Sequence, residues 1–404
     1  MNDSIQSSVV VSRPTLLING KQVADLDQDL LALFIKHKVN HVSRCELRFS
    51  NWGTMGRNVG YRYFDLDSFN FGQVLEVLDA EDQRLFIGRI DQIDASYPSN
   101  EPPGIKIVAE DRLAELNIVR RTRSAQEIRS TVMIESIAAD YSLLLDIRVA
   151  LPDVILPIIS QVNQTDFQLI SHLTQQLGVE FWLDDDTLSV SERSLADDSE
   201  LELRYGRELS AFEAKADLSD QVSELSVTSW SALEKAIIKQ TVNHQIMANE
   251  SSGKTGGEIV KSMIGQRHQR LVNQMPVNDE HARIIAEAEY RLQARRFVTG
   301  RGLCEVGGHL RIGTLLNLEG LGNLFEGQYY VNEVTHLFDS NLGFRSEFEV
   351  ERPALGIESF GKHSRTTEKE KTRKPKRETN VQKTSQTSPS KPSRKRKPAL
   401  TEHD

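Results

Sequence analysis

The sequence predicts an α+β fold that is mainly β, with two similar β-barrel-like domains, an inserted α/β region and a disordered basic C-terminal tail. Segments toward each end of the chain alternate apolar and polar residues, as half-buried strands do. Two segments between them carry apolar residues at helical spacing. The final 44 residues are rich in Lys, Arg, Ser, Thr and Pro and offer little to bury, which predicts disorder.

Length and charge divide the chain. Its 404 residues exceed what one hydrophobic core usually holds. Residues 361–404 contain 14 Lys or Arg and 5 Asp or Glu, so they carry +9 of a total net charge of −9 and the remainder carries −18. We predict four segments: a first β-barrel-like domain, 1–122; an α/β insert with two helices and a hairpin, 123–198; a second β-barrel-like domain, 199–355, with a polar loop at 239–278 and a helix at 279–297; and the disordered basic tail, 356–404.

Composition also bounds the cellular setting. Two cysteines, Cys45 and Cys304, cannot form a disulfide framework, so synthesis and assembly in the cytoplasm are expected. Residues 1–14 lack the basic start and the apolar stretch of a signal peptide. The longest strongly apolar run, residues 30–35, is far shorter than the roughly 18 residues of a membrane span. A soluble protein is predicted.

The N-terminal third is predicted to form β-hairpins in series. Residues 13–23 contain a strand, an Asn-Gly turn signal and the start of a second strand. Residues 41–50 alternate imperfectly between apolar and polar side chains. Residues 72–94 give two strands around an acidic turn at Asp79–Asp82.

Two helices and a hairpin are predicted for the insert. The first helix, within residues 129–143, has one apolar face made of Ile134, Ile137, Ala138 and Tyr141. The second begins with a capping box of Thr165 and Gln168 and ends at Gly178. Its apolar stripe consists of Phe167, Ile170, Leu173 and Leu177. A hairpin follows at once, around the turn Asp184–Asp186.

Strands return after residue 200, the clearest being residues 221–230. Residues 239–278 are polar and are predicted to be a mobile loop. The next helix is capped by Asn278 or Asp279 and supported by a Glu287–Arg291 pair. With strands on both sides of the insert, the chain follows a duplicated plan.

A glycine-rich segment, residues 318–331, invites comparison with a nucleotide-binding loop. Such a loop leads into a helix, whereas residues 328–339 alternate like a strand. The residues before the glycines also alternate, with apolar side chains at Leu310, Ile312, Leu316 and Leu318. Gly320, Gly322 and Gly327 therefore predict a turn between two strands, because glycine accepts positive φ.

Other motifs with possible chemistry fail on spacing or residue type. A P-loop would need glycine where Ala248 stands. His37 and His41 are separated as in a zinc protease, but Lys38 replaces its glutamate. Asp184–Asp186 lack the spacing of a calcium loop. His336 has no accompanying nucleophile elbow, so a packed histidine is expected. We predict no catalytic, cofactor-binding or metal-binding residue, no cofactor, and a protein that is not an enzyme.

The basic tail permits two interpretations. Its clusters RKPKR and KPSRKRKP could bind an anionic partner: nucleic acid, lipid or an acidic protein surface. A solvated tail that only aids solubility fits the same composition.

Several blocks together resemble one family. These are residues 164–190, residues 209–230, which end in a Trp, and residues 297–339, with Phe-Val-x-Gly, Arg-x-Gly and Gly-x-Tyr-Tyr-Val patterns. They resemble the phage late control gene D and VgrG family, the baseplate hub proteins of contractile tails and contractile injection systems. The resemblance spans about residues 12–353. Its motif positions, which the resemblance implies are structural, are Asp166, Phe167, Trp230, Phe297, Gly300, Gly313, Gly320, Gly327, Tyr330 and Val331.

The resemblance implies a homotrimer in which each chain supplies two similar barrels, so that a three-fold assembly matches a six-fold tail tube. It implies a structural adaptor in a phage tail or injection particle, with a tail tube protein, a spike protein and baseplate components as partners. No fused spike follows Arg352, so a separate spike chain is expected. The alternatives are a peptidoglycan-degrading tail-associated enzyme and a nucleic-acid or membrane-surface binding protein that acts through its basic tail.

Overall fold

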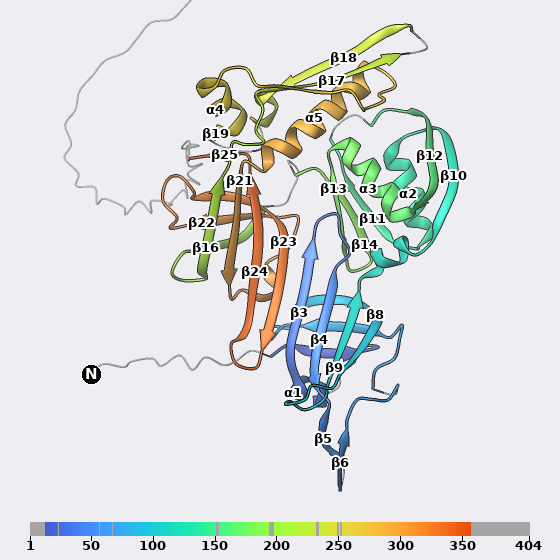
Figure 1. The fold of residues 1–404 in the computed structure, drawn as a ribbon, viewed down its shortest axis with the longest axis vertical. Coiled ribbons are helices and arrows are strands. Elements are labelled where there is room, and N and C mark those ends of the chain that lie inside the picture. The colour runs from blue at the N-terminus through green and yellow to red at the C-terminus, as the bar shows by residue number, and fades with distance from the viewer. Residues whose placement is uncertain are drawn as a thin grey trace, which may run out of the picture. The chain divides into compact units, whose positions relative to one another are not determined.

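The computed structural model describes residues 13–356, apart from residues 23, 56, 67, 151–152, 194–197, 232–233, 249 and 251–252 (Figure 1). All of the described residues belong to one compact unit. The fold is mainly β, as predicted. Most helices lie in the inserted region, residues 112–191, or in the segment between residues 224 and 295. The predicted disordered tail falls, from residue 357 on, outside the described residues.

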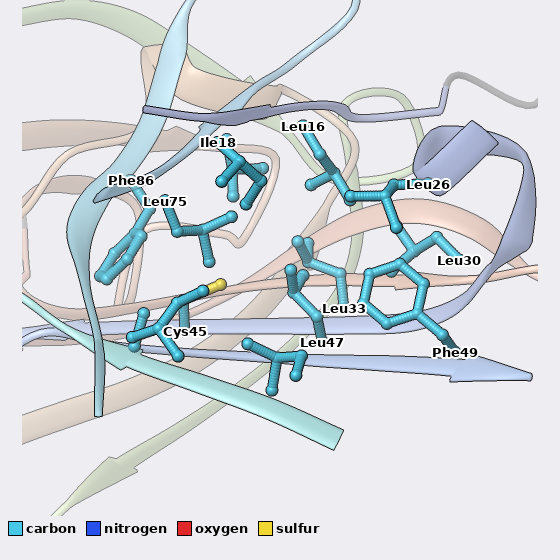
Figure 2. Close-up of a cluster of buried hydrophobic side chains, with 14 of the residues drawn as sticks. Leu16, Ile18, Leu26, Leu30, Leu33, Cys45, Leu47, Phe49, Leu75 and Phe86 are labelled. Carbon is cyan, nitrogen blue, oxygen red and sulfur yellow. The ribbon is translucent and has the colours of Figure 1, made fainter. Parts of the chain in front are cut away.

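The first β unit contains six strands in the order β3-β4-β9-β8-β7-β1, each antiparallel to its neighbours. They are β1 (Thr15–Ile18), β3 (Leu30–Lys38), β4 (Arg44–Ser50), β7 (Val74–Leu78), β8 (Arg84–Ser96) and β9 (Gly104–Glu110). Short elements join them: β2 (Lys21–Gln22), α1 (Ala24–Asp29), β5 (Trp52–Met55) and β6 (Asn58–Tyr61). The inward side chains of these strands form a core in which Leu33, Leu47 and Phe49 converge (Figure 2).

The second β unit contains six strands in the order β16-β21-β24-β23-β22-β15. They are β15 (Asp198–Arg204), β16 (Leu209–Ala216), β21 (Val298–Cys304), β22 (Leu315–Glu319), β23 (Gly327–Asp339) and β24 (Gly343–Arg352). Its own core includes Phe297, Tyr329, Val331 and Phe348. Both free cysteines are buried, one in each core.

The two β units repeat one pairing scheme. Adding 241 to each number turns Leu75 opposite Gly88 in β7–β8 into Leu316 opposite Tyr329 in β22–β23. The same offset carries β8–β9 onto β23–β24, including a β-bulge that lies between Ile90 and Gln92 in one and between Val331 and Glu333 in the other. Such bulges are specific local features, so their coincidence supports a structural duplication.

The remaining strands follow the same scheme with other offsets. β4 corresponds to β21 and β3 to β16, so that Ile35 opposite Cys45 matches Ala214 opposite Gly300. A bulge interrupts both pairs at the same place, between Leu30 and Ala32 and between Leu209 and Ala211. β1 and β15 occupy the same place in the order but differ in direction, since β1–β7 is antiparallel and β15–β22 is parallel.

The insert has its own core between the two β units in sequence. Its elements are η1 (Arg112–Asn117), β10 (Arg120–Ile128), α2 (Ser130–Asp140), β11 (Leu144–Arg148), β12 (Leu156–Thr165), α3 (Asp166–Leu177), β13 (Glu180–Asp184) and β14 (Thr187–Ser191). The predicted capping box of α3 is confirmed, with Thr165 and Gln168 each bonding the other's backbone N–H. Gly178 closes the helix at φ +71°, as expected for a left-handed C-cap.

The prediction that residues 239–278 are a loop is wrong. The segment holds most of β18 (Ala236–Asn243), then η3 (His244–Met247), β19 (Lys254–Thr255), α4 (Gly256–Met263) and β20 (His268–Leu271). β18 and β20 pair with opposite edges of β17 (Glu224–Ser231), so the backbone of each strand is hydrogen-bonded on the edge that faces β17 despite polar side chains. A few apolar residues, Val242, Met247 and Val260, are buried, and the first two pack in the core that includes α5.

The helix α5 (Asp279–Arg295) ends two residues before its predicted end. Asn278 is its N-cap and accepts from the N–H of His281, and the predicted Glu287–Arg291 pair forms at 3.4 Å. Phe297 instead begins the entry into β21. The strand predicted from Leu310 onward starts only at Leu315, because Gly313 takes φ +77° and interrupts it. β25 (Ala354–Leu355) closes the described chain against β19.

Candidate functional site

The two β units meet edge to edge along β3 and β23. Residues 333–339 pair antiparallel with residues 38–32, which joins both units into one 13-stranded sheet of the described chain (Figure 1). We call this ladder the seam. β23 can serve two partners on one edge because β22 covers only residues 327–330 and leaves the rest for β3.

Side chains reinforce the seam. The carboxylate of Glu333 lies 2.6 Å from Nζ of Lys36 and 2.9 Å from Nζ of Lys38, and its own side chain is 9% exposed. The two lysines together lower the pKa of Glu333, although burial by itself would raise it. Phe338 lies on β23 but is packed in the core of the first β unit. The seam therefore joins the two units through backbone, charge and core packing.

Two histidines lie at the seam and are held as structural groups. Nε2 of His37 lies 2.9 Å from the carbonyl oxygen of Leu85, and Nδ1 of His336 lies 2.8 Å from Oγ of Ser346. Burial lowers the pKa of both, and that of His336 to about 3. Neutral, hydrogen-bonded imidazoles agree with the packed histidine predicted at His336. Within the described chain, no group of three or more His, Cys, Asp or Glu side chains is arranged to hold a metal ion.

A cavity of about 320 Å³ lies beside the seam, lined by both β units and by the β13–β14 hairpin. His37, Trp182, Arg311 and His336 are among its lining residues. Each histidine uses one ring nitrogen in the hydrogen bond described, and among the described residues neither ring is hydrogen-bonded to a serine hydroxyl that lines the cavity. The cavity offers hydrogen-bonding groups, and the described residues around it do not form a nucleophile and base pair.

The acidic turn of the β13–β14 hairpin ties the insert to both β units. Asp185 pairs with Arg84 of the first unit at 2.8 Å, and Asp184 lies 3.6 Å from Arg311 of the second. Asp186 pairs with Arg112 at 2.7 Å. The predicted turn is confirmed, because β13 and β14 pair antiparallel up to Asp184 and Thr187. Its three carboxylates lie beside three arginines from separate segments. Each pair is partly exposed and so contributes modestly by itself.

A buried charge cluster joins the hairpin to the second unit. Arg193 binds Glu180 at 2.7 Å and Glu351 at 2.8 Å, and its guanidinium lies 4.2 Å from the ring centroid of Tyr330. Burial alone would lower the pKa of Arg193, but the two carboxylates raise it. Burial and the nearby Glu180 carboxylate raise the pKa of Tyr330 well above its ordinary value. The motif residue Tyr330 thus acts as a platform for a buried cation.

The motif residue Asp166 organises the insert. Its fully buried carboxylate accepts from Arg123 at 2.7 Å, Tyr141 at 2.8 Å and Gln161 at 3.0 Å, and Arg121 lies 3.3 Å away. Burial, followed by the Asp166 carboxylate, raises the pKa of Tyr141 to about 12. The neighbouring Phe167 packs against Phe181, with ring centroids 5.5 Å apart. This network connects β10, β12 and α2 to the start of α3.

The motif glycines serve close approaches and turns. Gly313, Gly320 and Gly327 have positive φ. A Cβ at Gly313 would lie 2.6 Å from the ring of Trp182, so the absence of a side chain here leaves room for Trp182 of the β13–β14 hairpin. Gly300 faces the ring of Phe212 across the β16–β21 pair. The apolar motif residues Phe297 and Val331 are buried in the second unit's core.

Trp230 differs from the other motif residues. It lies on β17 opposite Ile237 of β18, and the two side chains are 60% and 67% exposed. The buried residues Leu225 and Val227 occupy the other face of β17, toward α5. The structure therefore brings Gly327, Tyr330 and Val331 together on β23, keeps Asp166 within the insert, and leaves Trp230 on the surface.

Sequence reasoning missed the seam strand β3 and the cluster around Arg193. The segment LLALFI does not alternate strictly between apolar and polar side chains, so its sequence indicates an apolar run and not a strand. Lys36 and Lys38 are about 300 residues away from Glu333 in the sequence. Their ion pairs can therefore be recognised only once β3 and β23 are known to be neighbouring strands. Arg193 follows the hairpin without a local pattern that separates it from a surface arginine.

Among the described helices, none combines the length and apolar character that crossing a bilayer requires. The sequence matches the family Alg8_N, described as the Alg8 N-terminal domain, over residues 8–339. No curated protein matches.

The fold is similar to those of solved tail proteins. A 43 kDa tail protein of prophage MuSo2 from Shewanella oneidensis matches with TM-score 0.64 and 15% identity, covering 85% of this chain and 99% of that one. A tail protein from Neisseria meningitidis matches with TM-score 0.62 and 12% identity, covering 84% and 96%. An E. coli component of the type VI secretion system, described as similar to T4 bacteriophage tail proteins gp27 and gp5, matches with TM-score 0.54 and 12% identity, covering 83% and 76%.

Proposed function

The chain belongs to the Alg8 N-terminal domain family. From its similarity to the folds of solved tail proteins, we propose that it is a structural baseplate hub. Its particle is a contractile phage tail or a contractile injection system. The hub is a trimeric adaptor that joins a six-fold tail tube to a three-fold spike. This function agrees with the late control gene D and VgrG resemblance of the sequence.

One observation carries the proposal: the chain contains two β units with the same strand order, register and bulges. A partner with six-fold symmetry presents six equal contacts, which three ordinary subunits do not match. Three chains with two like units each present six like faces while keeping three-fold symmetry elsewhere. The duplication thus supplies what a symmetry adaptor needs.

The domain boundaries follow the same logic. We propose a first hub domain at 1–122, an insert at 123–198 and a second hub domain at 199–355, because each range supplies most of one of the cores described above. A few residues cross these boundaries: Phe338 packs in the first core, and Leu113, Leu116 and Ile284 pack in the core of the insert. The fourth core, around α5, lies within 199–355. The insert bridges both units through its acidic turn and so stiffens the pair.

The proposed partners are two further copies of this chain, the tail tube protein, a separate spike protein and other baseplate components. Assembly takes place in the cytoplasm, and the product is part of a tail or injection particle. The hub has a mechanical role and needs no cofactor. The ten motif positions act structurally in this proposal, with Trp230 as a surface contact and the others as parts of cores, turns and ion-pair networks.

Native mass measurement tests the proposal. The full chain, alone and with its tube protein, is expected to form a trimer that binds the end of the tube. A chain that stays monomeric in the presence of tube protein would contradict the adaptor function.

Incubation with purified cell walls separates the hub from the enzymatic alternative. The hub releases no soluble muropeptides, whereas release that depends on this chain would favour a peptidoglycan-degrading enzyme. A matched preparation of the tube protein alone serves as the control for contaminating hydrolases.

A further inference from the structure

The duplicated register has a consequence at the outer edges of the sheet. In the seam, β3 pairs with the part of β23 that β22 leaves uncovered. The counterpart of β3 is β16, and the counterpart of β23 is β8. In the described chain β16 forms a ladder only with β21, and β8 only with β7 and β9. The pairing that corresponds to the seam is therefore not made within one chain.

The unused edge of β8 has the same extent as the used edge of β23. Gln73 and Gly72 occupy the outer backbone of β8 as far as Ile90. Beyond that point, residues 92–97 correspond to residues 333–338 of the seam, by the offset of 241. Open backbone donors and acceptors on such an edge favour the addition of another strand.

Side chains at the free edge of β8 are more exposed than their counterparts on β23 at the seam, as expected if the β8 edge lacks a partner strand. Phe338 on the seam is 1% exposed, whereas its counterpart Tyr97 is 63% exposed. Likewise, Thr335 and His336 are buried, whereas the counterpart of Thr335, Asp94, is half-buried and the counterpart of His336, Ala95, is exposed. Across the missing ladder, the side chain of Lys215 on β16 is 73% exposed.

Resting on the proposed function, we propose that β16 of one chain pairs antiparallel with β8 of the next copy, in the register of the seam. The register aligns Val334 opposite His37 within the chain, so it aligns Ile93 opposite Ala216 between chains. It then aligns Asp94 with Lys215, Ala95 with Ala214, and Tyr97 with Phe212. The occupant of each open edge is thus a second copy of this chain.

The side chains at these positions fit this pairing. Asp94 and Lys215 carry opposite charges at directly opposed positions, as Glu333 and Lys38 do in the seam. Within the chain Asp94 already pairs with Lys106 at 2.8 Å and Lys215 with Asp217 at 2.6 Å, so the interchain contact extends two existing ion pairs. Phe212 is a partly buried member of the second core, and Tyr97 arrives beside it as Phe338 arrives in the first core. Pro98 ends the available edge, since proline lacks the N–H that a longer ladder needs.

The pairing is heterologous, because one edge of each chain meets the other edge of its neighbour. Such contacts propagate around an axis and close into a ring when the rotation permits. In that ring, intrachain seams and interchain seams alternate and resemble each other. Every β unit then has the same surroundings, whether its neighbour is in the same chain or in the next.

Cysteine cross-linking tests the register. Opposed residues in antiparallel strands have Cα atoms about 4.5–5.5 Å apart, which is within the range that a disulfide spans. The full-length double variant Ala95→Cys with Ala214→Cys is expected to form covalently linked oligomers on oxidation, reversed by reductant. The matched control Ala95→Cys with Ala216→Cys, two residues out of register, is expected to link about tenfold less. The native cysteines are buried and give no background.

Charge reversal provides a second measurement that does not depend on oxidation. Asp94→Lys and Lys215→Asp alone each place like charges opposite one another and are expected to weaken association about threefold. The double variant restores the opposite pair across the interface and is expected to recover part of the association, because each new side chain still lies beside a like charge of its own chain, Lys106 or Asp217. Rescue distinguishes a direct contact from a general loss of folding.

The outcomes separate this inference from the proposed function. Cross-linking at 95 and 214 with rescue by the charge swap supports the interchain seam. An oligomer that gives no such link overturns the seam but leaves the hub function standing. A chain that is monomeric even with tube protein overturns both.

Discussion

At the scale of single residues, several buried charged side chains hold different helices and strands together. Glu333, Arg193 and Asp166 are all buried with charged or hydrogen-bonding partners that come from other elements. Removing one partner of a buried pair leaves the other charge without compensation, which costs more than the intact pair contributes. These residues fix which elements lie together.

Arg193→Ala is expected to lower the free energy of unfolding by about 3–5 kcal/mol, because it removes the ion-pair partner that Glu180 and Glu351 share in a largely buried site. Chemical denaturation measures the change. The matched control Arg204→Ala removes an exposed partner of Glu319 and is expected to have a much smaller effect. Equal losses in the two variants would mean that Arg193 is not an essential part of the core.

His336 predicts a pH dependence. Its pKa is about 3 in the folded chain, against 6.5 ordinarily, because burial disfavours the charged ring. Between these values the unfolded chain binds the extra proton, so stability falls as pH falls from about 6.5 toward 3. His336→Gln is expected to reduce that loss by roughly 2–3 kcal/mol between pH 7 and pH 4, measured by urea unfolding. His172→Gln, at an exposed position on α3, is the control, and an unchanged slope at position 336 would refute the assignment.

At the scale of elements, strand ends and turns decide which segments meet. β23 reaches both β22 and β3 because β22 stops after four pairs. The β13–β14 hairpin reaches both units because its turn carries three acidic residues and because Gly313 leaves room for Trp182. The cavity beside the seam is bounded by these same elements.

Gly313→Ala tests the room left for the hairpin. A methyl group would lie 2.6 Å from Trp182 at a backbone position with φ +77°, so we expect a loss of about 2–4 kcal/mol in the free energy of unfolding. Gly322→Ala has nearly the same φ, +76°, with nothing within 4 Å of the added methyl group, and is expected to cost only about 1 kcal/mol. Similar thermal unfolding of the two variants would argue against close packing at Trp182.

How far the sequence predicted these elements depends on whether the signal is local. The capping box at Thr165 is local and was predicted, and the N-cap of α5 was narrowed to Asn278 or Asp279, of which the structure shows Asn278. β3 and the strands within 239–278 were missed because their pairing partners, β23 and β17, supply the stability that side-chain pattern does not reveal. For the motif residues, the sequence indicated a structural role but not whether the side chain is buried or exposed. Trp230 is exposed, for example, and Tyr330 is buried.

At the scale of the whole molecule, a duplicated plan was predictable from the distribution of strands, but its register was not. Some equivalent positions keep the same apolar residue, as Leu75 and Leu316 do, while others differ completely, as Phe86 and Gly327 do. Backbone pairing preserves a fold after side chains have diverged, so only coordinates reveal the matching bulges.

The charge imbalance gives a prediction for the chain as a whole. Residues 361–404 carry +9 against −18 for the rest, so any salt-dependent affinity of the full chain for duplex DNA should reside there. Deleting residues 361–404 is expected to abolish a gel shift at low salt. If the full chain gives no shift, the solvated-tail interpretation holds, and binding retained by the truncated chain would contradict the assignment.

Phe338 limits how this protein can be divided. By chain position it belongs to the second β unit, yet its ring completes the interior of the first. Separating the two β units would leave a cavity in the core of the first unit and would expose the ring of Phe338 on the second unit to solvent. Expression of isolated halves should therefore yield aggregation-prone fragments, and engineering efforts that treat the halves as interchangeable modules would need to carry the strand 327–339 across with the first half.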